Sequence, residues 1–240
     1  MPRLPETLSQ STLPCADRLV TSMGGSTLFP PENPWLDTEF FQQWKLFLEE
    51  EIQANRSIVA IIGGGEIARK RQQAARTVGI TDKNIIDGIG IDVTRNNAKI
   101  LRKLLNGLGI RARQYQWQDM KSSVVYLRGG TKSGHTTDLV AVEAAVRSHV
   151  TIVYNISNTP GLHPFKDGGF DRSKIISDIS YAELLPHIPE YESGQKVPFD
   201  KPSLLLAQQN NLTVVLVGQD FENLKRAMCG EVFEGTIIHP

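Results

Sequence analysis

Short apolar runs that end in glycine or in a polar turn, each followed by a helical pattern, recur along the chain and constrain its fold more than any other feature. The runs show no polar–apolar alternation, which is typical of strands covered on both faces. Strands that alternate with helices predict an α/β protein with a largely parallel sheet. Strands are expected at 18–23, 57–62, 123–127, 151–154 and 213–217, and helices at 40–52, 66–78, 101–108, 137–146, 181–185, 204–209 and 221–228.

The chain is long enough for one sizeable core, since it has 240 residues and 40% hydrophobic content. We expect a single domain over 17–240, with an N-terminal lobe at about 17–150 and a C-terminal lobe at about 151–240. The boundary between the lobes is expected in the loop 156–170, which is rich in proline and glycine. Residues 1–16 are polar, contain three prolines and lack the apolar stretch of a signal peptide, so we expect a flexible tail.

Charge and composition exclude several classes of protein. The 26 basic and 26 acidic residues give a formal net charge of zero, which argues against a nucleic-acid-binding protein. No apolar run approaches the ~18 residues of a membrane span, so no membrane partner is expected. The two cysteines, Cys15 and Cys229, make no disulfide framework and indicate a reducing cytoplasm. The five histidines show no metal-ligand spacing, so no protein-bound structural metal is expected.

Three glycine turns follow predicted strands and are candidate phosphate sites: Gly24-Gly25-Ser26, Gly63-Gly64-Gly65 and Gly129-Gly130-Thr131. Glycine lets backbone N–H groups approach an anion, and the start of the next helix adds partial positive charge. A single turn of this kind is weak evidence, but three in one domain favour a bound phosphate. Neither the P-loop motif nor the strict dinucleotide fingerprint is present.

The segment 129–138 is the most informative in the chain. Its hydroxyl groups, on Thr136 and Thr137, can donate hydrogen bonds to a phosphate. Asp138 follows them at an expected helix start, and two interpretations of its role remain open. The acid either stabilises the helix dipole or positions cations for phosphoryl transfer.

The order of the motifs resembles the uridylate kinases, most closely their archaeal branch, within the amino acid kinase superfamily. The matching segments are GGS at 24–26, GGG-x-x-A-R at 63–69, G-I-x-x-T-R-x-N-A at 90–98, GGT-x-x-GHTTD at 129–138 and GTII-x-P at 235–240. The resemblance runs from about Leu19 to Pro240. It implies the amino acid kinase fold, a three-layer αβα sandwich with a mainly parallel central sheet.

The resemblance also implies an intact acceptor half, which binds UMP. In the family, the residues that match Gly63, Gly64, Gly65 and Arg69 hold the UMP phosphate, and the residue that matches Asp87 binds the ribose. The loop that contacts uracil and the acceptor phosphate is matched by Gly130, Thr131, His135, Thr136 and Thr137. The family's aspartate that organises the transfer is matched by Asp138.

The donor half, which would bind ATP, departs from the family pattern. Relatives carry N-V-D-G-V-Y-T-x-D-P where this chain reads NISNTPGLHP at 155–164. The family's two acids and its tyrosine are replaced, and the lysine of D-P-L-A-A-K has become a leucine. The retained positions are Gly24, Gly25, Ser26, Asn155 and Pro164, and the altered ones are Ser157, Pro160, His163 and Leu205. Lys132 is the candidate replacement cation, although a solvated loop lysine is an equally good interpretation.

Two hypotheses from different classes remain open at this point. The first is an ATP- and Mg²⁺-dependent UMP kinase with a degenerate donor site and slow turnover. The second is a catalytically weak or inactive nucleotide- or oxyanion-binding paralogue that acts as a regulator, a storage subunit or a partner of an active kinase. Because relatives assemble, the resemblance also implies a homo-oligomer, either a dimer or a hexamer.

Overall fold

The structure, a computed structural model, describes residues 17–32, 35–117, 120–166, 169–171, 174–192 and 197–240. The tail expected at 1–16, with Cys15, lies outside the described residues. In chain order the elements are β1 (Arg18–Met23), α1 (Gly25–Leu28), α2 (Thr38–Gln53), β2 (Ser57–Ile62), α3 (Gly65–Thr77), α4 (Lys83–Gly107), β3 (Ala112–Gln114), β4 (Val125–Arg128), α5 (Thr137–Arg147), β5 (Ile152–Ile156), β6 (Phe165–Lys166), β7 (Gly169–Phe170), β8 (Asp178–Ser180), α6 (Tyr181–Leu184), a 3-10 turn (Leu185–His187), α7 (Lys201–Gln209), β9 (Thr213–Val217), α8 (Phe221–Met228) and β10 (Gly235–His239).

The described strands form an eight-stranded sheet in the order β3-β4-β2-β1-β5-β9-β10-β8, with a separate β6–β7 hairpin. Neighbouring strands from β3 to β9 are parallel, whereas β10 runs antiparallel to β9. The largely parallel sheet that the sequence predicts is confirmed. Because β1 pairs with β5, both expected lobes share one continuous sheet.

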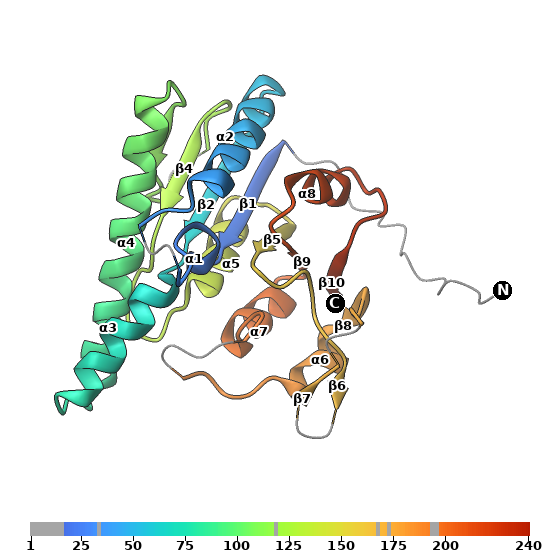
Figure 1. Cartoon of the computed structure of the whole chain (residues 1–240). Coiled ribbons are helices and arrows are strands. Elements are labelled where there is room, and N and C mark those ends of the chain that lie inside the picture. The colour runs from blue at the N-terminus through green and yellow to red at the C-terminus, as the bar shows by residue number, and fades with distance from the viewer. Residues whose placement is uncertain (1–16, 33–34, 118–119, 167–168, 172–173, 193–196) are drawn as a thin grey trace.

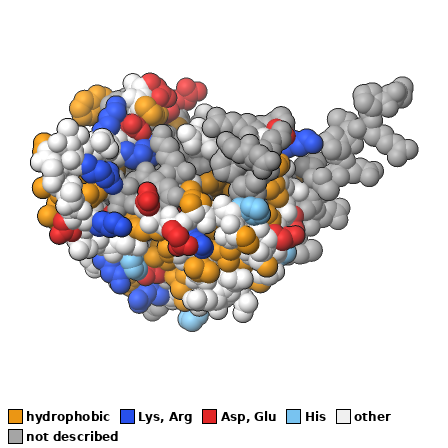
Figure 2. Space-filling model, turned by 90° about the horizontal axis from the view of Figure 1, so that it is seen from below, with side chains coloured by type: hydrophobic (Ala, Val, Ile, Leu, Met, Phe, Trp, Pro, Cys, Tyr) orange, Lys and Arg blue, Asp and Glu red, His pale blue; other side chains and the backbone are white. Residues whose placement is uncertain are grey.

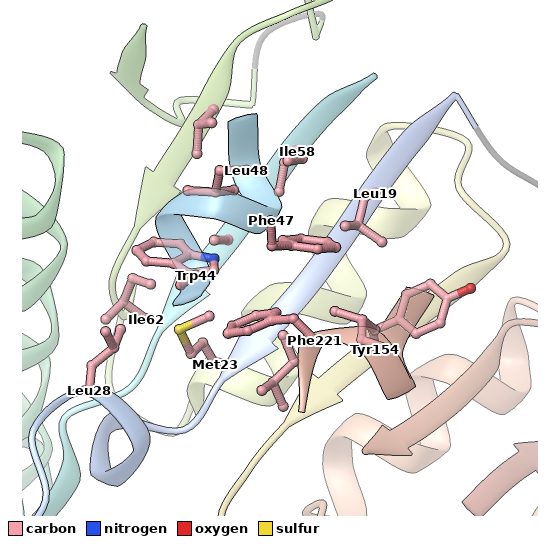
Figure 3. Close-up of a cluster of buried hydrophobic side chains, with 14 of the residues drawn as sticks. Leu19, Met23, Leu28, Trp44, Phe47, Leu48, Ile58, Ile62, Tyr154 and Phe221 are labelled. Atoms are coloured by element: carbon pink, nitrogen blue, oxygen red, sulfur yellow. The ribbon is translucent and has the colours of Figure 1, made fainter. Parts of the chain in front are cut away.

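Helices cover both faces of the sheet, as the three-layer prediction requires (Figure 1). On one face, α2, α4 and α8 pack on the sheet, with Trp44 and Phe47 of α2 among the most buried side chains. Figure 3 shows the Phe47 ring near Leu19 and Ile58, whereas the Trp44 ring lies near Leu28 and Ile62. On the other face, α5, α6 and α7 contribute the second buried cluster.

The long helix α4 is the main element that the sequence pattern predicted only in part. Asp82 caps its start by accepting a hydrogen bond from the Asn84 backbone N–H at 2.8 Å. The expected segment 101–108 is only its C-terminal end, since glycines at 88 and 90 interrupt the helical pattern. Gly90 lies close to α3, since a Cβ there would be 2.6 Å from the Gln72 amide nitrogen. The first turns of α4 therefore lie directly against α3.

No helix in the described part of the chain is long and apolar enough to cross a membrane.

Candidate functional site

The ends of β1 and β2 form a tightly packed pair of glycine turns. A Cβ at Gly25 would lie 2.1 Å from the Gly65 backbone nitrogen, and one at Gly63 would lie 2.5 Å from the Gly25 nitrogen. Gly65 has a φ of 63°, a conformation that favours glycine. The Gly63 carbonyl oxygen is fixed from below by the buried Asn97 amide at 3.0 Å. Glycine at these positions is thus required by close backbone packing, whatever the turns bind.

A cavity of about 200 Å³ opens beside these turns. In parallel sheets, ligands bind beyond the carboxyl ends of the strands, which is where this cavity lies. Eight of the ten predicted acceptor residues and the predicted organising acid line it. They are Gly64, Gly65, Arg69, Asp87, Gly130, His135, Thr136, Thr137 and, at the organising position, Asp138, while Gly63 and Thr131 are absent from the lining.

Arg69 joins α3 to the turn after β1. Its Nη2 donates to Ser26 Oγ at 3.0 Å and to Glu66 Oε2 at 2.8 Å, and its Nε donates to the same Glu66 oxygen at 3.0 Å. The guanidinium is half-buried and lines the cavity. An arginine in this place can hold a phosphate through parallel hydrogen bonds, but here the Nε–Nη2 edge of the guanidinium already binds Glu66.

Asp87 fixes the loop that follows β4. Its side chain is buried, and its Oδ2 accepts hydrogen bonds from Ser133 Oγ at 2.9 Å and from the Gly134 backbone N–H at 2.7 Å. The carboxylate thus joins α4 to the loop at the wall of the cavity. A polar ligand in the cavity would meet this carboxylate.

The same loop is held to α4 at two further points. The Gly130 backbone N–H donates to Thr94 Oγ1 at 2.7 Å. Arg95 donates to the Gly130 and Thr131 carbonyl oxygens at 3.0 and 2.6 Å. These bonds set the path of the loop before any ligand arrives, which favours a preformed site.

Asp138 lies in the first turn of α5, between β1 and β5. Its Oδ1 accepts from Ser22 Oγ at 2.6 Å and from Asn155 Nδ2 at 3.0 Å. Burial, and to a lesser degree the neighbouring Asp200 carboxylate, raises the pKa of Asp138 to about 7. An acid that served only the helix dipole would lie in solvent, so this geometry favours the interpretation that Asp138 belongs to the site.

Asp200 is a site residue that the sequence analysis did not select. It caps α7 through the Ser203 backbone N–H at 3.1 Å, and it is buried. Its Oδ2 also accepts from Thr136 Oγ1 at 2.5 Å, and Thr136 in turn caps α5. Asp200 lines the cavity and joins the two helix starts. The D-x-x-S spacing at 200–203 signals a helix cap, but nothing in the sequence signals the contact with Thr136.

Two predicted residues take less central positions. Lys132 is exposed on the loop and is absent from the cavity lining. His135 lines the cavity, and its Nδ1 lies 3.3 Å from Glu143 Oε1. Among the described residues, the cavity lining contains one arginine and no lysine.

The loop after β5, where the donor half is expected, folds back on the ends of β9 and β10. Ser157 Oγ donates to the Thr159 carbonyl oxygen at 2.9 Å, and Pro160 packs against Gly218. The Leu162 backbone N–H donates to the buried Thr236 hydroxyl at 2.8 Å. Residues 157–164, with the predicted Pro164, contribute nothing to the cavity lining. Gly24 also turns toward this loop, since its N–H donates to the Ile156 carbonyl oxygen at 2.9 Å.

The surface around the strand ends is uneven in charge. Figure 2 views the molecule from below, and its Lys and Arg side chains gather mainly on the side where α3 and α4 lie in Figure 1. Exposed basic residues of these helices include Lys70, Arg71, Arg76 and Lys83. An anionic ligand would approach this side more readily than the opposite one.

Comparison with known proteins agrees with this architecture. No family model matches the chain. The uridylate kinase of Methanobrevibacter smithii is 27% identical over 228 residues, which cover 92% of this chain and 99% of that protein. The uridylate kinase of Natronomonas pharaonis is 28% identical over 231 residues, which cover 93% of this chain and 99% of that protein.

Solved structures show the same likeness. The uridylate kinase from Archaeoglobus fulgidus superposes with a TM-score of 0.69 at 24% identity, covering 92% of this chain and 100% of that one. The UMP kinase from Bacillus anthracis gives a TM-score of 0.75 at 20% identity, covering 93% and 96%. The amino acid kinase fold and the resemblance to uridylate kinases, both inferred from the motifs, are confirmed.

Proposed function

We propose that this protein is a nucleoside monophosphate kinase that phosphorylates UMP to UDP with ATP and Mg²⁺, and that its donor half is altered. The observation that carries the proposal is the single cavity that brings together Gly64, Gly65, Arg69, Asp87 and Asp138. The similarity to uridylate kinases over nearly the whole chain supports a nucleotide as the acceptor.

The acceptor phosphate would lie against the turn after β2 and the Arg69 guanidinium. Backbone N–H groups of Gly64 and Gly65, at the start of α3, supply donors and partial positive charge. Asp87 would accept hydrogen bonds from the ribose. Thr136 and Thr137, at the start of α5, would face the phosphate that receives the transferred group.

Magnesium fits this site only in part. Asp138 and Asp200 carry oxygen ligands of the kind that Mg²⁺ prefers. Among the described residues, however, no three His, Cys, Asp or Glu side chains are grouped so as to hold a metal ion. Phosphate oxygens of the nucleotides would therefore supply most of the coordination, as they do in many Mg²⁺ sites. ATP, when bound, supplies the phosphoryl group.

A specific observation favours the alternative of a binding paralogue. Phosphoryl transfer relies on cations that neutralise the oxygens of the transferred group. The family lysine is Leu205 here, and the described cavity lining contains no lysine. Lys201 at the start of α7 pairs with Glu190 at 2.5 Å. Loss of one such cation costs a few kcal/mol of barrier, which is orders of magnitude in rate.

Formation of UDP from ATP and UMP in the presence of Mg²⁺ tests the proposal directly. We expect slow turnover in the parent and slower turnover in Asp138→Asn. Lys132→Ala is compared with Lys121→Ala, since both lysines are exposed. A robust rate lost only in Lys132→Ala would show that a loop cation has replaced the missing lysine.

Calorimetric titration separates the two hypotheses. We expect UMP to bind more tightly than ATP, because the acceptor residues line a cavity whereas the loop 157–164 packs on itself. UMP binding without turnover for any nucleotide pair would establish the binding paralogue. ATP binding without UMP binding would refute both the acceptor assignment and the asymmetry.

We also propose that the protein forms a homo-oligomer. Helix α4 and its C-cap residue Leu108 expose large apolar side chains that a second copy would cover, and Ile85, Leu104 and Leu108 are 49%, 37% and 46% exposed. The mass measured by light scattering distinguishes a monomer from a dimer or a hexamer.

A further inference from the structure

The order of the strands divides the candidate site into two sides. From β1, the chain builds β2, β3 and β4 on one side of that strand and then β5 and β9 on the other. Sheets of this kind bind ligands beyond the carboxyl ends of their strands, at the point where the strand order reverses. The acceptor cavity lies on the β2 side, since the turn after β2 and the loop after β4 line it. A phosphoryl donor would therefore approach on the side of β5 and β9.

The loop after β5, residues 157–164, lies against the strand ends on that side. A Cβ at Gly24, after β1, would lie 3.8 Å from Ser157 Cα. A Cβ at Gly218, after β9, would lie 3.5 Å from Pro160 Cα. Because the loop touches the ends of both neighbouring strands, the base of a donor nucleotide would lie outside the loop rather than between the strands.

The backbone N–H groups of this loop are largely committed within the protein. Three of them donate to protein oxygens, and two further positions are prolines, which have no N–H. The donors are Ser157 to the Val217 carbonyl oxygen at 3.1 Å, Thr159 to Ser157 Oγ at 3.2 Å and Leu162 to Thr236 Oγ1 at 2.8 Å, and the prolines are Pro160 and Pro164. Five of the eight residues thus offer no N–H to a ligand.

Several acceptors of the loop are committed in the same way. The carbonyl oxygens of Thr159, Leu162 and Pro164 accept from Ser157 Oγ at 2.9 Å, from the Ile176 N–H at 2.8 Å and from the Asp171 N–H at 2.9 Å. Specific recognition of a base requires precisely placed polar groups that face its edge. Groups that already bond within the protein would have to break those bonds first, so this loop is poorly suited to read a base.

The phosphates of a donor have partners that its base lacks. Asp138 and Asp200 line the cavity in which the acceptor phosphate would lie. Through Mg²⁺, their carboxylates would hold phosphate oxygens of the donor. Every nucleoside triphosphate carries the same phosphate chain, so this recognition does not depend on the base.

We infer that the protein recognises its donor through the phosphates and not through the base, so that any nucleoside triphosphate serves, and inorganic tripolyphosphate as well. The inference rests on the proposed function and names the chemical class of its donor. In the transfer, an oxygen of the UMP phosphate bonds to the terminal phosphorus, and the bond from that phosphorus to the bridging oxygen breaks. UDP forms in each case. The leaving group is a nucleoside diphosphate, or inorganic diphosphate when tripolyphosphate is the donor.

Calorimetric titration with Mg²⁺ and saturating UMP tests the inference, with ATP, GTP, CTP and tripolyphosphate as the four probes. Saturating UMP fills the acceptor site, so that a probe has to bind beside it. Competition with ATP shows whether the other probes share its site, and UDP formation is measured with each probe.

A pair of variants tests the side chains nearest to the expected position of the base. Asn158→Ala/Gln219→Ala removes two exposed amides, from the loops after β5 and β9, that could otherwise pair with the edge of a base. The matched control is Gln73→Ala/Asn96→Ala, on exposed positions of α3 and α4 outside the cavity lining. Thermal unfolding checks that both variants fold.

We expect the four probes to bind within about threefold of one another, to compete with ATP and to form UDP at comparable rates, with the same ratios in both double variants. A preference for ATP of about tenfold or more, the scale of a single hydrogen bond to a base, would overturn the inference and leave the proposed function standing. So would a ratio of ATP to GTP affinity that changes in Asn158→Ala/Gln219→Ala but not in the control.

Two other outcomes would also count against the inference. Displacement of UMP by tripolyphosphate would assign tripolyphosphate binding to the acceptor site, and it would overturn the inference alone. A lack of binding by all four probes, or equal binding without UDP formation, would overturn the inference and the kinase activity together. If UMP still binds in that case, the binding paralogue is the hypothesis that is left.

Discussion

Replacing Asp138 by asparagine should change how stability depends on pH. Burial raises the pKa of this carboxyl from 3.8 to about 7 in the folded protein. Since the folded state then holds its proton more tightly than the unfolded state, its contribution to stability is full below pH 3.8 and is lost as pH rises to about 7. The side chain keeps its hydrogen bonds from Ser22 and Asn155 if an amide oxygen takes the place of Oδ1.

The magnitude follows from the interval between these pKa values. Each pH unit is worth about 1.4 kcal/mol, so the two units from pH 5 to pH 7 amount to roughly 3 kcal/mol. Between pH 5 and pH 8 the parent should therefore lose roughly 3 kcal/mol of unfolding free energy that Asp138→Asn keeps. Above pH 7 the two curves should run parallel.

Urea unfolding at pH 5, 6, 7 and 8 measures the effect as the difference between the parent and the variant. Asp92→Asn, on an exposed position of α4, controls for the removal of one carboxylate elsewhere. Parallel stability curves for the parent and Asp138→Asn across the whole range would refute the reasoning. They would mean that Asp138 is as well solvated in the folded protein as in the unfolded chain.

Three further changes test other contacts of the site. Arg69→Ala should weaken UMP binding by roughly 2–3 kcal/mol, the scale of charge-assisted hydrogen bonds, and Arg69→Lys should restore little of this binding energy. Calorimetry measures both variants, and unchanged affinity would mean that Arg69 is only a surface residue of α3. Glu66→Gln should raise UMP affinity several-fold, because the Glu66 carboxylate occupies one edge of the Arg69 guanidinium at 2.8 and 3.0 Å; weaker binding in this variant would show that Glu66 orients Arg69 rather than competing for it. Gly63→Ala should destabilise the protein by more than about 2 kcal/mol in urea unfolding, since its Cβ would lie 2.5 Å from the Gly25 nitrogen. The control is Gly107→Ala, where a Cβ meets nothing within 4 Å. Equal stability of the two variants would contradict the close packing at Gly63.

The fold was largely predictable because its strands are buried on both faces. All five predicted strands exist, and burial on both faces explains why their sequences are continuously apolar. The edge strands β3 and β8 were missed, because each is only three residues long. Most of α4 was missed for a different reason. Glycine in a sequence is typical of a helix break, and the close approach of Gly90 to Gln72 is visible only in three dimensions.

The site was predictable where it is local in sequence. The glycine turns and the threonines at 136–137 could be found because they are contiguous. Contacts between segments that are distant in the sequence could not be predicted. Asp200 meets Thr136 across 64 positions, and Asp138 meets Ser22 across 116. Periodicity and motif spacing carry no information on such pairs. The role of Lys132 stays a prediction, although its exposed position gives it no support.

The two hydrogen bonds that Asp87 already accepts have a consequence for binding kinetics. A ribose hydroxyl that is to bond to Oδ2 has to displace Ser133 or Gly134, which hold that oxygen at 2.9 and 2.7 Å. The apparent affinity is then the intrinsic affinity multiplied by the fraction of molecules in which the loop has released Asp87. In stopped-flow mixing, the observed rate constant should level off at high nucleotide concentration, at the rate of loop release. Ser133→Ala, which removes one of the two bonds, should raise that plateau.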